Sequence, residues 1–292
     1  MTLTELDYLA PSSAEEAAGA LGRTAGAKVL GGGTDLLVQM RAGRVRPGLI
    51  VDLKRIPGAI GVRKGADGGF VIGAATPGAV LGENAELTRA WPGVVEAANL
   101  IGSTQVQGRA SLGGNLCNAS PAADSVPAMV AARAVCVVVG QAGRREVPVE
   151  AIQASPGRTS LKPDEFILEF HLPPRPARSS DAYLRLIPRT EMDIAVVGAG
   201  VNLALGADGR IAAAHVALGA VAPTTLLVAE AGAALVGSLL DEAALARLDA
   251  AAQAACRPIS DKRGTVEYRT QIAGVLARRA ATIAYQRAQA RA

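Results

Sequence analysis

Histidine and cysteine are scarce in this chain: two histidines and three cysteines occur among 292 residues. His171 and His215 are too few to build a histidine-based zinc site or a Ser-His-Asp triad. Cys117, Cys136 and Cys256 are far apart and form no CxxC pair. This argues against a disulfide framework or an iron–sulfur cluster held by this chain alone. The sequence therefore predicts no catalytic residue and no metal ligand, and it favours a reducing cytoplasm.

Aromatic residues make up only 3% of the chain, and the net charge of +4 is small. The basic residues are scattered and lack interleaved aromatics, which argues against nucleic-acid binding. No charge-free apolar run reaches the roughly 18 residues of a transmembrane helix. Residues 1–7 contain neither a basic region nor an apolar core, so we expect no signal peptide.

Glycine, by contrast, is concentrated in two informative segments, Lys28–Leu37 and Ala110–Asp124. Each leads from apolar residues into consecutive glycines and then into small hydroxyl or amide side chains. Because glycine has no Cβ, the backbone can approach a ligand and turn its N–H groups toward it. Clusters of such N–H groups bind anions and suit phosphates. We therefore expect the two segments to hold a ligand with a pyrophosphate from two sides.

The first glycine segment is expected to lie in a strand–loop–helix–strand unit. Ser12 with Glu15, or Ser13 with Glu16, forms a capping box that starts a helix ending near Leu21. A strand over 27–30, a helix over 36–41 and a strand over 49–53 follow. The glycine loop then opens a helix N-terminus, which is a favoured place for an anion.

The rest of the chain predicts an α+β protein. Strands are expected over 60–62, 70–72, 74–75, 136–139, 146–149 and 165–172, and helices over 91–101 and 126–132. Proline and arginine in 173–180 indicate a linker. Beyond it, strands over 194–205 and 211–218 surround an Asp-Gly turn, and helices over 241–256 and 268–288 follow. We expect three domains, over 1–57, 58–176 and 177–292.

Several other features have plain structural interpretations. The Gly198-Ala199-Gly200 stretch resembles a Rossmann fingerprint, but Leu203 occupies the third glycine position and the segment continues as a strand. Cys117 is either a small filler residue or a reactive thiol. The arginines of the closing helix form either a solvated face or a contact with an acidic partner; they are Arg278, Arg279, Arg287 and Arg291.

Chemistry alone leaves ATP, NAD and FAD open as the nucleotide, although the lack of Gly-Lys-Ser/Thr argues against a P-loop. The motifs themselves go further. Leu30–Leu36, Ser111–Asn115 with the following Ser120-Pro121 and Asp124, and Tyr183–Ala195 occur in order. At these residues the chain resembles the FAD-binding medium subunits of the molybdenum hydroxylases, the family of xanthine dehydrogenase and carbon monoxide dehydrogenase.

This resemblance covers nearly the whole chain and implies a two-subdomain FAD-binding fold of the vanillyl-alcohol-oxidase/PCMH type, followed by a C-terminal α+β domain. The residues that it assigns to FAD are Val29, Leu30, Gly31, Gly32, Gly33, Thr34, Asp35, Leu36, Ile101, Ser111, Leu112, Gly113, Gly114, Asn115, Asp124, Ile167, Arg185 and Ile194.

Within this set, the resemblance gives the pyrophosphate to the two glycine segments. Asp124 is expected at the ribitol or ribose, Ile167 and Ile194 beside the isoalloxazine, and Ile101 on the adenine side. Arg185 stands where several relatives carry lysine near the flavin. Ile194 is aliphatic where some relatives have an aromatic residue. Gln107 replaces a common arginine and receives no role, and no cysteine-rich insertion for an extra cluster is present.

The resemblance also implies a function and partners. A large subunit with a molybdenum cofactor and a small subunit with 2Fe–2S clusters are expected to pass electrons to FAD on this chain, in a dimer of heterotrimers. The flavin then delivers them to a final acceptor. Two alternatives remain open, a self-contained flavin oxidase and a non-catalytic assembly module of the same fold. We also expect the FAD to be noncovalent, and valine at Gly32 or Gly114 to displace it from a chain that still folds.

Overall fold

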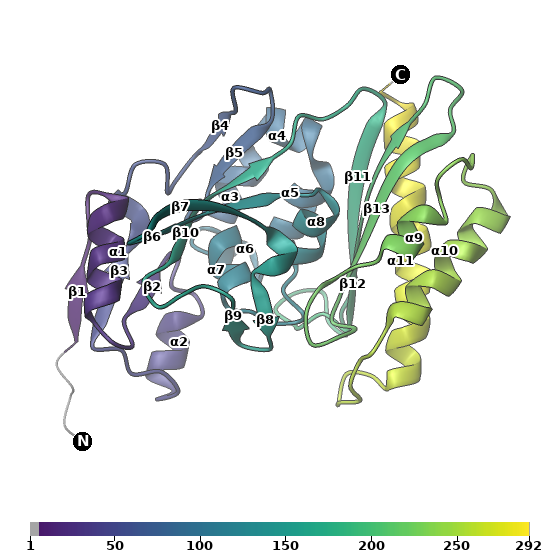
Figure 1. Ribbon diagram of the computed structural model, residues 1–292. Coiled ribbons are helices and arrows are strands. Elements are labelled where there is room, and N and C mark those ends of the chain that lie inside the picture. Colours follow the sequence, from purple (N-terminus) through teal and green to yellow (C-terminus); the bar gives the residue numbers. More distant parts are fainter. Residues whose placement is uncertain (1–5, 292) are drawn as a thin grey trace.

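The computed structural model describes residues 6–291 of the protein. Residues 1–5, which include most of the segment considered for a signal peptide, lie outside the described part. Three hydrophobic clusters form the core, and the chain forms three sheet-containing regions in succession (Figure 1). One cluster joins the first region to the second through Val139, Phe166 and Leu168. No helix between residues 6 and 291 combines the length and the hydropathy required to cross a bilayer.

The N-terminal region is a three-stranded parallel sheet in the order β1-β3-β2. Its elements are β1 (Asp7–Leu9), α1 (Ala14–Arg23), β2 (Lys28–Leu30), α2 (Leu36–Arg41), β3 (Leu49–Asp52) and the 3-10 turn η1 (Leu53–Arg55). Ser13 caps α1 by accepting a hydrogen bond from the backbone N–H of Glu16 at 3.1 Å. The first glycine segment links β2 to α2, as its sequence predicts. Strand β1 was not predicted from the sequence.

The second region is a five-stranded antiparallel sheet in the order β4-β5-β10-β6-β7, with short helices against it. The strands are β4 (Val62–Lys64), β5 (Phe70–Gly73), β6 (Val135–Gly140), β7 (Gly143–Pro148) and β10 (Phe166–Leu172), with the small pair β8 (Gln153–Ser155) and β9 (Arg158–Thr159). The helices are α3 (Gly78–Glu83), α4 (Ala85–Ala90), α5 (Pro92–Ala98), α6 (Thr104–Gln107), α7 (Leu112–Cys117), α8 (Ser125–Ala131) and the 3-10 turn η2 (Val149–Ala151).

The expected strand over 74–75 is wrong, because Ala74 and Ala75 lie in the turn after β5. The expected helix over 91–101 is shorter than predicted, since α5 ends at Ala98. The second glycine segment, from which no helix was predicted, contains α7.

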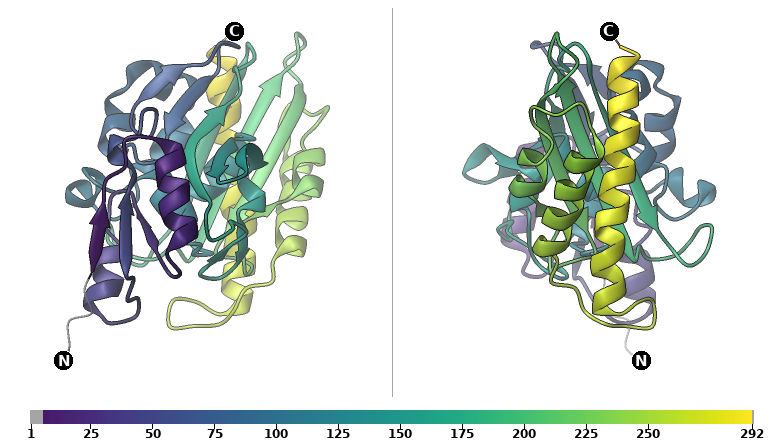
Figure 2. Two further views of the ribbon diagram at one scale, coloured as in Figure 1. Left: turned by 60° about the vertical axis from the view of Figure 1, so that its left-hand side comes forward. Right: turned by 90° about the vertical axis from the view of Figure 1, so that its right-hand side faces the viewer.

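The C-terminal region is a four-stranded antiparallel sheet covered by helices on both faces (Figures 1 and 2). Its elements are β11 (Ser179–Leu186), β12 (Val197–Leu205), β13 (Ile211–Gly219), β14 (Leu226–Leu227), α9 (Ala229–Ala233), α10 (Glu242–Ala255) and α11 (Val266–Gln289). Helix α11 packs on β11 and β12 from one side, while α5 and α8 of the second region pack on the same sheet from the other. The Gly198–Gly200 stretch lies inside β12, so its interpretation as a strand is confirmed.

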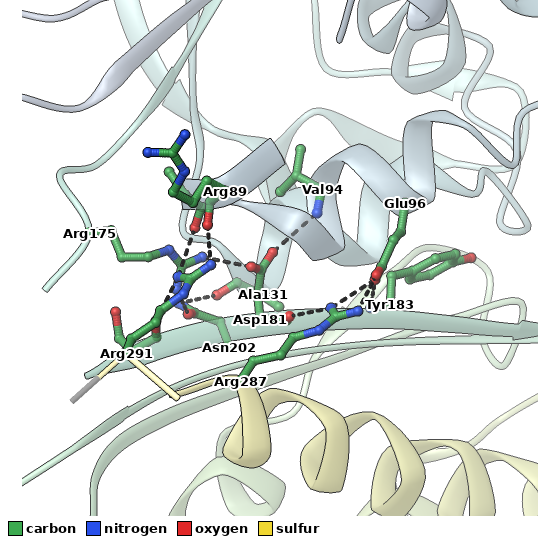
Figure 3. A network of polar contacts seen from close by, with 12 residues as sticks. Arg89, Val94, Glu96, Ala131, Arg175, Asp181, Tyr183, Asn202, Arg287 and Arg291 are labelled. Atoms are coloured by element: carbon green, nitrogen blue, oxygen red, sulfur yellow. Dashed lines mark hydrogen bonds and ion pairs between the residues drawn. The ribbon is translucent and has the colours of Figure 1, made fainter. Parts of the chain in front are cut away.

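A buried polar network joins the second and third regions (Figure 3). Asp181 on β11 is 2% exposed; its carboxylate accepts hydrogen bonds from Arg175 at 2.8 Å and from the backbone N–H of Val94 at 3.1 Å. The guanidinium of Arg175 stacks 3.6 Å from the ring centroid of Trp91. The connection between β10 and β11 is therefore anchored by packing and by an ion pair.

Arg287 of α11 and Arg291, which follows that helix, reach the same network. Arg287 pairs with Glu96 on α5, and Arg291 donates to the carbonyl oxygens of Arg89 and Ser179 (Figure 3). These two residues are therefore bound within the chain and do not form a solvated face.

Candidate functional site

A cavity of about 540 Å³ lies where the N-terminal region meets the second region. Both glycine segments line it, as does a third segment that contains Gly157–Ile167. The remaining wall comes from Leu21 on α1, Leu53 after β3 and the turn after β5. The cavity thus collects residues from separate parts of the chain, and neither histidine lines it.

The first glycine segment offers free N–H groups to the cavity. Gly32, Gly33 and Thr34 line it, and their backbone N–H groups have no hydrogen-bond acceptor among the described residues. Gly33 has φ +78°, a left-handed conformation that glycine adopts without strain. Because these N–H groups have no acceptor within residues 6–291, they can donate to a ligand with anionic oxygens.

The carboxylate of Asp35 stands at the end of this segment, where α2 begins. It makes no capping hydrogen bond with the helix. Burial raises its pKa above the usual value. Leu36, the first residue of α2, also lines the cavity, so this helix start is part of the wall.

The second glycine segment forms the opposite wall. Ser111 caps α7, and its hydroxyl accepts a hydrogen bond from the backbone N–H of Gly114 at 3.2 Å. The N–H of Gly113 donates to the carbonyl of Ala74 at 3.0 Å, which ties the segment to the turn after β5. Asn115 is oriented by its side-chain oxygen, which accepts from the Ser125 hydroxyl at 2.7 Å.

The glycines of the two segments differ in the space that a side chain would have at their positions. A Cβ at Gly31 or Gly114 would meet only the Ser111 hydroxyl, at 3.4 Å and 3.3 Å. A Cβ at Gly32 would overlap the carbonyl oxygen of Arg109, and one at Gly113 would lie 2.6 Å from that of Ala74. The structure contradicts the expectation that a valine at Gly32 leaves the chain folded, because its Cβ would overlap the backbone of Arg109.

The segment Gly157–Ile167 forms a third wall of the cavity, and the sequence predicted little of it. Only Ile167 was predicted from it, whereas its other residues in the cavity lining are Gly157, Thr159, Leu161, Lys162, Pro163, Glu165 and Phe166. Gly157 lies between β8 and β9, Thr159 ends β9, and the others lead into β10, which begins at Phe166. Gly157 has φ +73° and so signals a turn, but no local pattern shows that this turn folds back onto the glycine segments.

Most residues that the resemblance assigns to FAD line the cavity, and five do not. Ile101 and Ile167 are in the lining, together with most of both glycine segments. The assigned residues outside the lining are Leu30, Leu112, Asp124, Arg185 and Ile194.

Asp124 and Arg185 contact each other instead of the cavity. The Arg185 guanidinium donates to the Asp124 carboxylate at 2.7 Å, and the side chains are 4% and 11% exposed. The Tyr183 hydroxyl donates to the same carboxylate at 3.4 Å. Burial raises the pKa of Asp124 to about 6, against the opposing effect of Arg185. Although Asp124 directly precedes α8, its side chain makes no capping hydrogen bond with that helix.

Ile194 and Ile101 lie on neighbouring segments. The loop that carries Ile194 contacts the second region through Met192, whose N–H donates to the carbonyl of Gly102 at 3.2 Å. Ile194 itself is 51% exposed. The resemblance places these two isoleucines at different parts of the cofactor, whereas the structure brings their segments together.

The donor set fits a bound dinucleotide. Peptide N–H groups, the Thr34 and Ser111 hydroxyls and the Asn115 amide can bind phosphate and sugar oxygens, and apolar side chains on the third wall can cover rings. Cys117 also lines the cavity, where the residue is exposed.

Comparisons with known proteins agree with this geometry. Residues 4–175 match the family described as "FAD binding domain in molybdopterin dehydrogenase", and residues 182–284 match the "CO dehydrogenase flavoprotein C-terminal domain". The carbon monoxide dehydrogenase medium chain of Afipia carboxidovorans is 34% identical over 98% of this chain and 97% of its own. The xanthine dehydrogenase FAD-binding subunit of Escherichia coli O157:H7 is 33% identical over 68% of each chain.

A solved structure shows the same fold. The reconstituted CO dehydrogenase from Oligotropha carboxidovorans contains a chain that superimposes with a TM-score of 0.91 at 33% identity, covering 100% of both chains. The predicted fold class, FAD as the cofactor and an oxidoreductase subunit as the kind of protein are thereby confirmed. The chain belongs to the family of FAD-binding medium subunits of the molybdenum hydroxylases.

Proposed function

We propose that this chain holds FAD between its two glycine segments and, within a molybdenum hydroxylase, transfers electrons from 2Fe–2S clusters of a partner to a final acceptor. The observation that carries the proposal is that Gly32, Gly33 and Thr34 line the cavity while their backbone N–H groups have no acceptor within the described chain. The flavin supplies the redox chemistry, and the protein binds and orients it.

Each wall of the cavity has a separate role in this proposal. The segments around Gly31–Leu36 and Ser111–Asn115 bind the pyrophosphate through N–H and hydroxyl groups. The third wall, with Leu161 and Ile167, excludes water from one side. Ile101 covers one end of the cavity. The buried Asp124–Arg185 pair fixes the second glycine segment from behind, because Ser125, next to Asp124, binds the Asn115 side chain.

An electron-transfer role requires no acid–base group of this chain, because the flavin carries the redox chemistry. No group of metal-ligating side chains is found among residues 6–291. Relatives named as medium chains and FAD subunits belong to multisubunit enzymes. We therefore infer a large molybdenum subunit and a small 2Fe–2S subunit as partners, in a dimer of heterotrimers. The three cysteines are free in the described chain, which fits a reducing compartment, and we expect the complex in the cytoplasm.

Purification of the native complex through a tag on this chain tests the proposal. We expect two partner subunits and one noncovalent FAD per copy of the chain, released by acid. A chain that binds FAD alone and oxidises an organic substrate at full rate would instead be a self-contained oxidase. A chain that co-purifies with partners but never contains flavin would be an assembly module.

A further inference from the structure

Lys54 lies directly behind the first glycine segment, outside the cavity lining. Its ammonium donates to the carbonyl oxygen of Gly31 at 3.1 Å and to the carboxylate of Asp52 at 2.7 Å. The side chain is 32% exposed. Neither the glycine motifs nor the resemblance includes this residue, and it follows β3 rather than the loop that it contacts.

Asp52 holds Lys54 in this position. Asp52 is 5% exposed and lies opposite Leu30 in the pairing of β2 with β3. Its carboxylate also accepts hydrogen bonds from the Tyr8 hydroxyl at 2.6 Å and from the backbone N–H of Lys54 at 3.0 Å. Burial alone would raise its pKa, but the bonds from Lys54 and Tyr8 outweigh this effect and lower the pKa. Asp52 is therefore ionised at neutral pH.

The contact with Lys54 fixes the orientation of a peptide in the glycine loop. The carbonyl and the N–H of a trans peptide point in opposite directions. Because Lys54 holds the carbonyl of Gly31 from behind, the N–H of Gly32 in the same peptide points away from Lys54. Gly31 and Gly32 line the cavity, and this N–H has no acceptor in the described part of the chain.

We propose that Lys54 is a positioning residue for the pyrophosphate, an inference that rests on the proposed function. It orients the Gly31–Gly32 peptide so that its N–H faces the anion. It also balances the charge of Asp52. Without Lys54, the buried carboxylate of Asp52 would lack its cationic partner and would lie near the proposed site of the negatively charged pyrophosphate. Tyr8 and Asp52 serve this role by holding Lys54.

The experiment uses the full chain freed of flavin. FAD dissociation constants are measured for wild type, Lys54→Met, Lys54→Arg and Lys262→Met, the last removing an exposed lysine of the C-terminal region. We expect Lys54→Met to raise the dissociation constant at least about tenfold, since charge-assisted hydrogen bonds are the strong ones. Lys54→Arg restores part of the affinity because it keeps the charge and the donors, and Lys262→Met has no effect.

Competition by ADP and by adenosine separates positioning from general stability. Lys54→Met should weaken ADP as a competitor while leaving adenosine unchanged, because only ADP carries phosphates. The ratio of the ADP and adenosine inhibition constants compares two ligands on the same folded molecules. It therefore tests the role of Lys54 even if the variant has a lower melting temperature. An equal loss for both ligands, or an unchanged FAD affinity, would overturn the role of Lys54. Failure of wild type to bind FAD would overturn the proposed function as well.

Discussion

Alanine at Gly31 and alanine at Gly113 should separate the cofactor function of the glycine segments from their packing function. A methyl group at Gly31 meets only the Ser111 hydroxyl, 3.4 Å away, and the backbone there does not require a positive φ. The folded chain accepts this change, and replacing glycine even favours folding by about 0.5 kcal/mol. The methyl group nevertheless stands between the two segments, where the pyrophosphate is proposed to bind.

The two substitutions are expected to change different quantities, FAD affinity for Gly31→Ala and stability for Gly113→Ala. The methyl group of Gly31→Ala would displace the pyrophosphate and so cost it a hydrogen bond to the backbone. Loss of one hydrogen bond to a charged phosphate oxygen costs about 1.5–3 kcal/mol, so FAD binding should weaken about ten- to a hundredfold. Gly113→Ala places its Cβ 2.6 Å from the carbonyl oxygen of Ala74, an overlap that costs about 2 kcal/mol and lowers the melting temperature by about 4–8 °C.

The assay is a pair of measurements on each purified variant: the melting temperature without flavin and the FAD dissociation constant by fluorescence quenching. Gly31→Ala should keep its melting temperature and lose affinity, and Gly114→Ala should behave in the same way. Gly113→Ala should have a lower melting temperature than the wild type. An unchanged FAD affinity in both Gly31→Ala and Gly114→Ala would refute the assignment of the pyrophosphate to these segments.

Three further predictions follow from other parts of the structure. Asp124→Ala leaves the guanidinium of Arg185 buried without a partner and should destabilise the chain by about 3 kcal/mol in denaturant titration; unchanged stability would show that the ion pair is not maintained. Asp181→Ala should destabilise by a similar amount and shift the fluorescence of Trp91, the single tryptophan, because its arginine neighbour loses its anchor; an unshifted spectrum would contradict the network. Cys117 lines the cavity and is exposed, so bound FAD should slow its alkylation by iodoacetamide; equal labelling rates with and without FAD would contradict the proposed cofactor site.

The elements that the sequence predicted well have strong local signals. The capping box at Ser13 and Glu16 fixes the start of α1, and the Asp-Gly turn at 208–209 fixes the β12–β13 hairpin. The two glycine segments were predicted to come together, and the structure brings both to the lining of one cavity. Consecutive glycines next to hydroxyl groups are a local pattern, so they can be read without knowledge of tertiary contacts.

The features that the sequence did not predict depend on contacts between distant segments. Strand β11 begins with Ser179-Ser180-Asp181, which has low strand propensity; its pairing with β12 and the packing of α5 and α11 decide its conformation. Helix α7 contains adjacent glycines, which disfavour helices, and is held by its Ser111 cap. The contact between Lys54 and Gly31 crosses from one strand end to another, and no spacing in the sequence reveals it.

A structure of the chain with FAD bound tests the central claim most directly. The account predicts that the pyrophosphate lies between the two glycine segments, within hydrogen-bonding distance of the N–H groups of Gly32, Gly33 and Thr34. It also predicts that Lys54 still holds the carbonyl of Gly31 from behind. A pyrophosphate bound elsewhere, or N–H groups that remain without an acceptor in the loaded protein, would contradict it.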